Sequence, residues 1–340
     1  MDPTDLPSTQ RPGFSHRYEV QAVLLATDLG GVLGVFLAIV LVLGGMSWGG
    51  FLPDRALLAD ADSAILGAKA ELASSSSMAS GPSIAVVGDS SCLIDVDVPT
   101  LRSEGVQAVN LGTLSYLGID SFGRLAERFC GGRAGMRIVL VVHPEGLRSA
   151  TTSPHHRAIL EAALDRGVAG PADLPLAAFV PSVFDGFRDR VLDRWIPTPL
   201  RGGLGARYGF TLDLRREVVS TGGTLEETAV FDPRATGPVS GDYRLARRIE
   251  GECRAFRALL PQEIRLEVLL TPVPASRALR EHPQRMRELH RDLASWLDAD
   301  PAVPPLPLVL PDFAFGTPTH LLPSAAREYS RQLAAHFRAR

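Results

Sequence analysis

The sequence predicts an α/β domain with a mostly parallel sheet, helices on both faces, and one transmembrane helix before it. Short apolar runs rich in valine and isoleucine alternate with longer amphipathic segments. Because these runs are continuously apolar, they indicate strands that are covered on both faces, as in parallel sheets. Near the amino terminus an uncharged apolar stretch has the length that a membrane span requires.

Composition narrows the class of protein. The chain has 340 residues, 45% of them hydrophobic, and a formal net charge of -3, which suits one large globular domain and offers no basic surface for nucleic acid. The three cysteines, Cys92, Cys130 and Cys253, have no C-x-x-C spacing, so we expect no metal centre and no cofactor. Three buried thiols are expected, with a disulfide between Cys130 and Cys253 as the alternative in an oxidising compartment.

The predicted membrane segment covers residues 20–47, behind a tail of residues 1–19. Residues 29–46 (LGGVLGVFLAIVLVLGGM) contain no charged side chain. A hydrocarbon core of about 30 Å needs roughly twenty such residues at a rise of about 1.5 Å each. The alternatives are a buried core helix, which seldom has so long an uncharged run, and a cleaved signal peptide, which would begin earlier and be shorter.

Charges on either side of this segment predict its orientation. Arg11 and Arg17 precede it, whereas Arg55 is the only arginine that closely follows it. The positive-inside rule then places residues 1–19 in the cytoplasm, and the rest of the chain on the periplasmic, extracytoplasmic side of the cytoplasmic membrane.

Three residues in the segment suggest contact with another integral membrane protein or complex. Gly30 and Gly34 form a G-x-x-x-G pair, which allows a second helix to approach closely. Asp28 lies at the cytoplasmic boundary, where a carboxylate often has a partner. The alternative is that both glycines are incidental and that Asp28 lies among lipid headgroups.

The soluble part divides into a connection and a domain. Residues 48–81 are expected to form a juxtamembrane helix and a serine-rich linker, and residues 82–340 the α/β domain. A region rich in proline and glycine, about 149–251, interrupts the domain as an irregular insertion. Outside it, apolar runs predict strands at 84–87, 107–111, 137–142, 264–271 and 307–310, and amphipathic patterns predict helices at 119–129, 285–297 and 324–337.

Two motifs at the ends of this domain could carry chemistry. Gly88, Asp89 and Ser90 follow the first strand, and a serine on such a turn is how α/β hydrolytic folds expose a nucleophile. His320 follows the last strand and could lie at the same carboxyl edge of the sheet. Histidine is the base suited to accepting the proton of a serine hydroxyl at neutral pH.

Taken together, these motifs resemble the SGNH, or GDSL, hydrolase family. Its first block matches Gly88 to Ser90, its second matches residues 110–112 (Asn-Leu-Gly), and its last matches residues 317–321 (TPTHL), so the resemblance covers residues 82–340 apart from the insertion. It implies that Ser90 is the nucleophile, that His320 is the base, and that the backbone N–H groups of Ser90 and Gly112 form the oxyanion hole. With a membrane anchor, the chain looks most like extracytoplasmic proteins that transfer or remove acyl groups on polysaccharides and cell walls, often beside a membrane-bound O-acyltransferase.

The sequence departs from the family pattern in two blocks. Thr317 stands where the last block has the aspartate that orients the histidine, and Asp312 is the nearby carboxylate that could replace it. In the third block Glu145 replaces an asparagine that donates to the oxyanion, and His143 is a substitute donor. Two hypotheses follow: a serine esterase or O-acyltransferase acting on acylated glycans, or a catalytically degenerate accessory subunit of a membrane complex.

Overall fold

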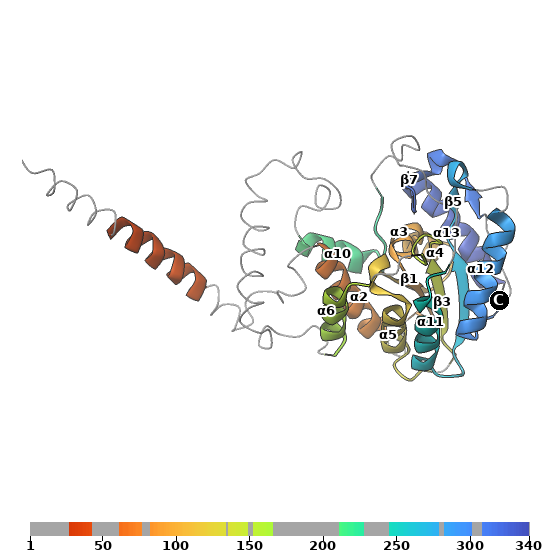
Figure 1. Cartoon of the computed structure of the whole chain (residues 1–340), viewed down its shortest axis with the longest axis horizontal. Coiled ribbons are helices and arrows are strands. Elements are labelled where there is room, and N and C mark those ends of the chain that lie inside the picture. The colour runs from red at the N-terminus through yellow and green to blue at the C-terminus, as the bar shows by residue number, and fades with distance from the viewer. Residues whose placement is uncertain are drawn as a thin grey trace, which may run out of the picture. The chain divides into compact units, whose positions relative to one another are not determined.

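The computed structural model describes residues 27–42, 61–76, 82–133, 135–148, 152–165, 211–227, 245–278, 282–300 and 308–339. The chain divides into two units, Met1–Pro53 and Asp54–Arg340, which we treat separately. The second unit contains the α/β domain (Figure 1).

The centre of the second unit is a four-stranded parallel sheet with the order β2-β1-β3-β4. These strands confirm the α/β class and four of the five expected strands; their bounds are Ile84–Gly88 (β1), Ala108–Gly112 (β2), Arg137–Val142 (β3) and Arg265–Leu270 (β4). All four are almost entirely buried, as their continuous apolar runs predict. Because the strands are parallel, the carboxyl ends of β1 and β2 meet at one edge, where the register pairs Gly88 with Gly112.

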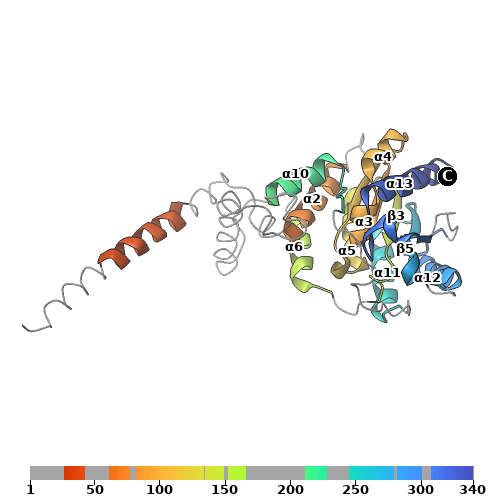
Figure 2. The same ribbon diagram turned by 90° about the horizontal axis from the view of Figure 1, so that it is seen from above.

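Helices cover both faces of this sheet, and alternate strand residues point to each face. Ile138, Leu140 and Val142 belong to one apolar cluster, whereas Val139 and Val141 belong to the other. The larger cluster lies under α2, α5, α11 and α12, and the smaller one under α4 and α13 (Figure 2). Their bounds are Ala61–Ser76 (α2), Val98–Ser103 (α4), Ile119–Cys130 (α5), Arg248–Leu259 (α11), His282–Leu297 (α12) and Pro323–Arg338 (α13).

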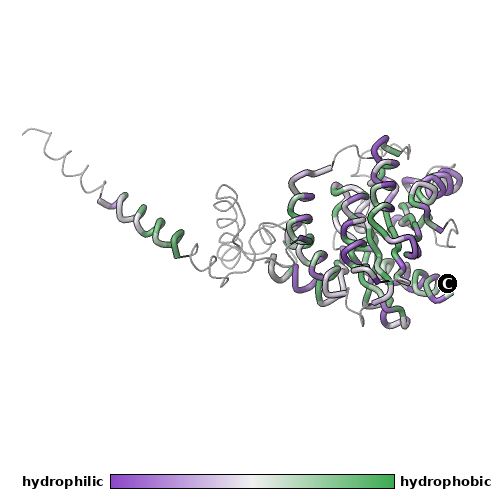
Figure 3. Tube along the Cα trace, turned by 90° about the horizontal axis from the view of Figure 1, so that it is seen from below, coloured by the Kyte–Doolittle hydropathy of each residue, from purple (hydrophilic) through white to green (hydrophobic). Residues whose placement is uncertain are grey.

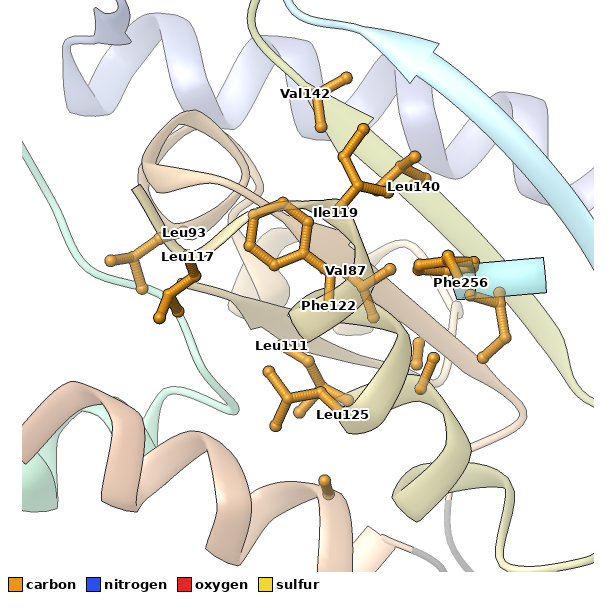
Figure 4. Packing of buried hydrophobic residues seen from close by; sticks show 14 of the residues in the cluster. Val87, Leu93, Leu111, Leu117, Ile119, Phe122, Leu125, Leu140, Val142 and Phe256 are labelled. Atoms are coloured by element: carbon orange, nitrogen blue, oxygen red, sulfur yellow. The ribbon is translucent and has the colours of Figure 1, made fainter. Parts of the chain in front are cut away.

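The larger cluster is built from aromatic and branched side chains. Figure 4 shows Val87, Leu111 and Leu140 of three neighbouring strands gathered around Phe122 of α5 and Phe256 of α11. All five side chains are at most 2% exposed. Burying a side chain of this size contributes about 1.5–3 kcal/mol.

Helix α2 corrects the expected domain boundary at residue 82. Its side chains are buried almost all round, including Ile65 and Leu66, and it packs against α5 and against two helices of the expected insertion. These are α6 (Pro154–Asp165) and α10 (Thr211–Ser220), which lie beside α2 in both views (Figures 1 and 2). The segment placed in the juxtamembrane connection is therefore part of the core, because a helix with apolar or small residues on every face is stable only when covered.

The expected strand at 307–310 does not join the main sheet. Its described part forms β6 (Val309–Leu310), which pairs with β5 (Val273–Pro274) in a separate parallel pair. A second small sheet, antiparallel, joins β7 (Phe315–Thr317) to β8 (His320–Leu321). Short 3-10 turns and the six-residue α3 complete the described elements: Ser115–Leu117 (η1), Ala275–Arg277 (η5), Asp312–Ala314 (η6) and Ser90–Asp95 (α3).

In the first unit, the described residues 27–42 form a helix that is largely hydrophobic (Figure 3). Its large apolar side chains are exposed, among them Leu33 and Val42. Residues 20–26 and 43–47 of the predicted span, and the predicted tail of residues 1–19, lie outside the described residues. Among the described residues, no helix has both the length and the apolar character needed to cross a membrane.

Candidate active site

The structure brings Ser90 and His320 together. The hydroxyl Oγ of Ser90, the first residue of α3, lies 3.0 Å from Nε2 of His320, the first residue of β8. Both residues are partly buried. The serine and the histidine that the sequence places at one edge of the sheet are thus within hydrogen-bonding distance.

Two residues before Ser90 fix the turn that presents it. Gly88 ends β1 so close to β3 that a Cβ atom there would lie 1.8 Å from the carbonyl oxygen of Val141, and only glycine fits. The carboxylate of Asp89 caps α3 by accepting the N–H of Ser91 at 3.0 Å, and it also accepts the N–H of His143 at 2.9 Å. Asp89 therefore ties the end of β1 to the end of β3, although burial raises the pKa of this carboxyl.

A hairpin presents His320. The N–H of Leu321 donates to Oδ1 of the buried Asp95 at 2.8 Å, which fixes the hairpin against α3. Within the turn, the N–H of Thr319 donates to the hydroxyl of Thr317 at 3.4 Å. Thr317, which replaces the aspartate of the resembled family, thus shapes the turn before His320.

Glu227 supplies the carboxylate that orients the imidazole. Its Oε2 atom lies 2.9 Å from Nδ1 of His320, and the side chains of His320 and Glu227 are only 17% and 14% exposed. Because an ionised carboxylate only accepts hydrogen bonds, the proton of the neutral imidazole belongs on Nδ1. Nε2 is then left to accept the hydrogen bond of Ser90, which is the arrangement of a Ser–His–acid triad.

Asp312, the orienting acid expected from the sequence, is therefore a wrong assignment. Its Oδ1 atom accepts the N–H of Ser276 at 2.9 Å and holds together two short 3-10 turns. Glu227 lies 93 residues before His320, inside the expected insertion, and no spacing rule connects the two residues. The sequence offered no signal for it.

The described residues 221–227, which we call the acid strap, carry Glu227 along the edge of the sheet. Gly222 accepts the N–H of Asn110 in β2 at 2.9 Å, and Leu225 donates to the carbonyl of Leu93 in α3 at 3.2 Å. The hydroxyl of Thr224 donates to the carbonyl of Val96 at 2.9 Å and accepts the N–H of Val98 at 3.0 Å. The strap is thus bonded to β2 and to both ends of the turn after α3.

Gly112 has a packing role in place of the expected oxyanion role. Its N–H donates to Oδ1 of Asn110 at 2.8 Å, so that N–H is engaged. A Cβ atom at Gly112 would lie 2.5 Å from the backbone nitrogen of Leu93 and 2.7 Å from Sγ of Cys92. The side-chain amide of Asn110 in turn donates to the carbonyls of Cys92 and Val96, which joins β2 to α3. The glycine of the second block is needed here because α3 passes directly over it.

The third block is occupied by structural contacts. Nδ1 of the buried His143 accepts the N–H of Glu145 at 3.1 Å, and the Glu145 carboxylate pairs with Arg148 at 2.9 Å. Nδ1 of His143 therefore closes the turn after β3 by accepting the N–H of Glu145. Of the two backbone N–H groups expected to form the oxyanion hole, that of Gly112 is bonded to Asn110. The N–H of Ser90 therefore remains as the candidate donor.

The other residues singled out in the sequence are also placed. Cys92, Cys130 and Cys253 are buried free thiols, as expected, and burial raises the pKa of Cys130 to about 11. Gly30 and Gly34 lie on the helix of residues 27–42, where a Cβ atom would meet nothing within 4 Å, and Asp28 is exposed. Within the described ranges, no group of three or more His, Cys, Asp or Glu residues could hold a metal ion.

No protein-family model, no curated protein and no solved structure matches this chain.

Proposed function

We propose that this chain is a membrane-anchored extracytoplasmic serine esterase or O-acyltransferase that acts on acylated glycans. One observation supports the chemistry above all others: Ser90 Oγ, His320 and Glu227 are linked by hydrogen bonds of 3.0 and 2.9 Å. A serine hydroxyl is a weak nucleophile until a base takes its proton, and this chain of contacts supplies both the base and the group that orients it. The SGNH-like placement of Ser90 and His320 suggests ester substrates.

In the first half of the proposed reaction, Ser90 Oγ attacks the carbonyl carbon of an acyl ester while Nε2 of His320 takes the hydroxyl proton. The imidazolium that forms carries a second proton on Nδ1, and the Glu227 carboxylate stabilises that charge. When the tetrahedral intermediate collapses, the bond to the leaving oxygen breaks, and that oxygen takes the proton from Nε2. The products are an acyl-Ser90 ester and a free alcohol.

In the second half, a hydroxyl compound enters, His320 takes its proton, and its oxygen attacks the acyl carbon. Collapse releases Ser90, which regains the proton from Nε2. If the attacking compound is water, the result is ester hydrolysis; if it is a glycan hydroxyl, the result is acyl transfer. Glu227 stabilises the imidazolium in the same way in both cases. The triad alone therefore supports both ester hydrolysis and acyl transfer.

The oxyanion of the intermediate needs a hydrogen-bond donor, and the proposal assigns this to the backbone N–H of Ser90. Removing one donor from an oxyanion hole costs about 3 kcal/mol in the barrier. Because Gly112 N–H is already bonded to Asn110, this site has a weaker oxyanion hole than the family pattern implies. A modest turnover on simple esters is the expected consequence.

Anchoring of the chain through residues 20–47 is part of the proposal. It is supported by the uncharged run at 29–46 and by the exposed apolar side chains along the helix of residues 27–42. With residues 1–19 in the cytoplasm, the active site would lie on the periplasmic side, where acylated glycans are found. Resistance of the full chain to carbonate extraction from membranes would support the anchor, and release into the soluble fraction would refute it.

The engaged N–H of Gly112 and the glutamate in the third block favour a second candidate. In that case the fold is a catalytically inactive accessory subunit that binds another integral membrane protein through Asp28, Gly30 and Gly34. Glu227 weakens this alternative because it restores the acid that Thr317 lacks. Purification in mild detergent distinguishes the two: a stoichiometric membrane partner without esterase activity supports the subunit, and an active chain without a partner supports the enzyme.

Hydrolysis of p-nitrophenyl acetate by the purified full chain in detergent tests the enzyme proposal. We expect Ser90-dependent hydrolysis that Ser90→Ala abolishes and that Ser103→Ala, at an exposed serine on α4, leaves unchanged. Equal rates for the wild type and Ser90→Ala would refute the assignment of Ser90 as the nucleophile.

A further inference from the structure

Lys69 is the only lysine in the chain, and it is completely buried. It lies in α2, with apolar neighbours along the same helix. A buried lysine is costly unless its nitrogen finds hydrogen-bond acceptors, and an apolar residue would fill the same space without that cost. Its contacts therefore indicate what the amine does.

The amine bridges the acid strap and the strand beside it. Nζ of Lys69 donates to the carbonyl of Gly223 at 2.5 Å and to the carbonyl of Asn110 at 2.9 Å. Gly223 is part of the acid strap, shortly before Glu227, and Asn110 is part of β2, shortly before Gly112. One side chain thus holds the strap and the edge strand at a fixed separation.

The topology explains why this position needs a donor. β2 is an edge strand, so its outward backbone groups have no partner strand. The strap satisfies the N–H of Asn110 through Gly222, but the carbonyl of Asn110 still needs a donor, and Lys69 supplies it. The strap approaches so closely that a Cβ atom at Gly223 would lie 1.8 Å from the Asn110 carbonyl oxygen. A displacement of the strap here would move Glu227 relative to His320.

The two hydrogen bonds do not depend on the charge of the amine. Burial lowers the pKa of Lys69 to about 7, while the electrostatic effect of Cys92 acts in the opposite direction. A neutral amine retains two N–H donors, which matches the two carbonyls. The contact therefore persists whether the nitrogen is protonated or not.

We infer that Lys69 is a positioning residue that holds the acid strap against β2 so that Glu227 reaches Nδ1 of His320. This inference rests on the proposed function for its consequence in catalysis. Lys69 does not contact the reacting atoms; it acts through Glu227. A small misplacement of a catalytic group can cost about a hundredfold in rate, so the effect of losing this contact is measurable.

The test is a double-mutant cycle in the full chain, with Lys69→Met and Glu227→Gln, measured by hydrolysis of p-nitrophenyl acetate. Lys69→Met keeps an unbranched side chain that is one atom shorter, and it removes the donors. We expect it to lower kcat by about 10- to 100-fold with little change in KM, and to have no further effect in the Glu227→Gln background, because coupled residues are not additive. Glu71→Gln is the control, since Glu71 lies on the same helix and bonds to Arg215 of α10.

A second measurement does not require activity. In NMR spectra of the full chain labelled at histidine, the imidazole N–H that faces Glu227 should give a downfield proton resonance that Glu227→Gln removes. Lys69→Met should remove or shift the same resonance while the melting temperature stays near that of Glu71→Gln. If Lys69→Met fails to fold, Lys69→Gln, which keeps two donors on a shorter chain, should show a partial loss of kcat and a shifted resonance.

The inference is overturned if Lys69→Met retains both kcat and the resonance, or if it lowers kcat equally with and without Glu227. Failure of the proposed function looks different: the wild type itself would show no Ser90-dependent hydrolysis. In that case the resonance still reports whether Lys69 positions the strap.

Discussion

Glu227 Oε2 lies 2.9 Å from Nδ1 of His320, although the two residues are 93 positions apart in the chain. His320 is presented by a hairpin at the carboxyl end of the domain, whereas Glu227 arrives along the edge strand β2 on a separate strap. The acid of this site therefore belongs to a different segment from its histidine. A complete Ser–His–acid arrangement is therefore possible with a threonine at position 317, because Glu227 supplies the carboxylate from another segment.

The first prediction concerns Glu227 and Asp312. Glu227→Gln should lower kcat for ester hydrolysis by roughly 10³- to 10⁴-fold, because an amide neither fixes the Nδ1–H tautomer nor stabilises the imidazolium. Asp312→Asn should change kcat less than about twofold, since the Asp312 carboxylate accepts the N–H of Ser276 and lies outside the triad. Initial rates with p-nitrophenyl acetate compare the two variants; the reverse ranking would contradict the assignment.

The second prediction concerns Asp95, whose pKa is raised well above 3.8 by burial first, and also by the negative charges of Asp89 and Glu227. A group with a raised folded-state pKa contributes stability below its unfolded pKa and loses that contribution as the pH rises. Asp95→Asn, which keeps an acceptor for Leu321 N–H, should match the wild type near pH 4. Above that it should become the more stable form, by at most about 1.4 kcal/mol per pH unit.

Urea unfolding of the wild type and Asp95→Asn between pH 4 and pH 8 measures this difference. A wild type that gains stability over the variant as the pH rises would mean that the Asp95 carboxylate is ionised and paired in the folded state.

The third prediction compares two glycines. Gly112→Ala should lower the free energy of unfolding by about 1–3 kcal/mol, because its Cβ atom would lie 2.5 Å from the backbone nitrogen of Leu93. Gly251→Ala in α11 should raise it by up to about 1 kcal/mol, because nothing lies within 4 Å and alanine favours a helix. Opposite signs in chemical denaturation are expected; equal effects would show that α3 does not pack on Gly112 as described.

The fourth prediction concerns the buried ion pair between Arg137 and Glu267, whose nitrogen and oxygen are 2.7 Å apart. Burial alone would raise the pKa of Glu267, but hydrogen bonds from Arg137 and His336 outweigh it and hold the pKa below 4.5. Arg137→Met leaves the carboxylate buried with one partner fewer, so unfolding free energy should fall by about 3–5 kcal/mol.

The matched control for this pair is Arg331→Met, which removes an exposed partner of Glu328. It should cost less than about 1 kcal/mol at neutral pH, because solvent screens the pair. Thermal or chemical unfolding of both variants checks the contrast, and similar losses would mean that burial does not govern the Arg137 pair.

Much of the sheet could be predicted because its strands are continuous apolar runs. The predicted strand at 137–142 coincides with β3. A continuous run of branched apolar residues is typical of a strand that is buried on both faces, as in a parallel sheet. The prediction that 307–310 is a strand of the main sheet was wrong, because two of its residues form a short pair with β5. A short apolar run has the same sequence pattern in either kind of pairing. The helix expected in the connection is α2, but it was placed outside the domain because a serine-rich stretch that resembles a linker follows it.

The site was only half predictable for a related reason. Ser90 follows β1 of the parallel sheet, as expected. His320 lies close to it as predicted, but it begins β8 of a separate antiparallel pair, and the strand expected before it does not belong to the main sheet. Glu227 follows no strand and belongs to a region without regular periodicity, so its position follows from the contacts that Lys69, Asn110 and Val96 make with the strap. Those contacts join residues far apart in the chain, which local patterns do not record.

Labelling of the full chain with a fluorophosphonate probe tests the activation of Ser90 most directly, because such probes react only with a serine whose proton is taken by a base. Peptide mapping by mass spectrometry should find one adduct, on Ser90, in the wild type. The adduct should be absent in Ser90→Ala and much slower to form in Glu227→Gln. No adduct in the folded wild type, or an adduct on a different serine, would contradict the account.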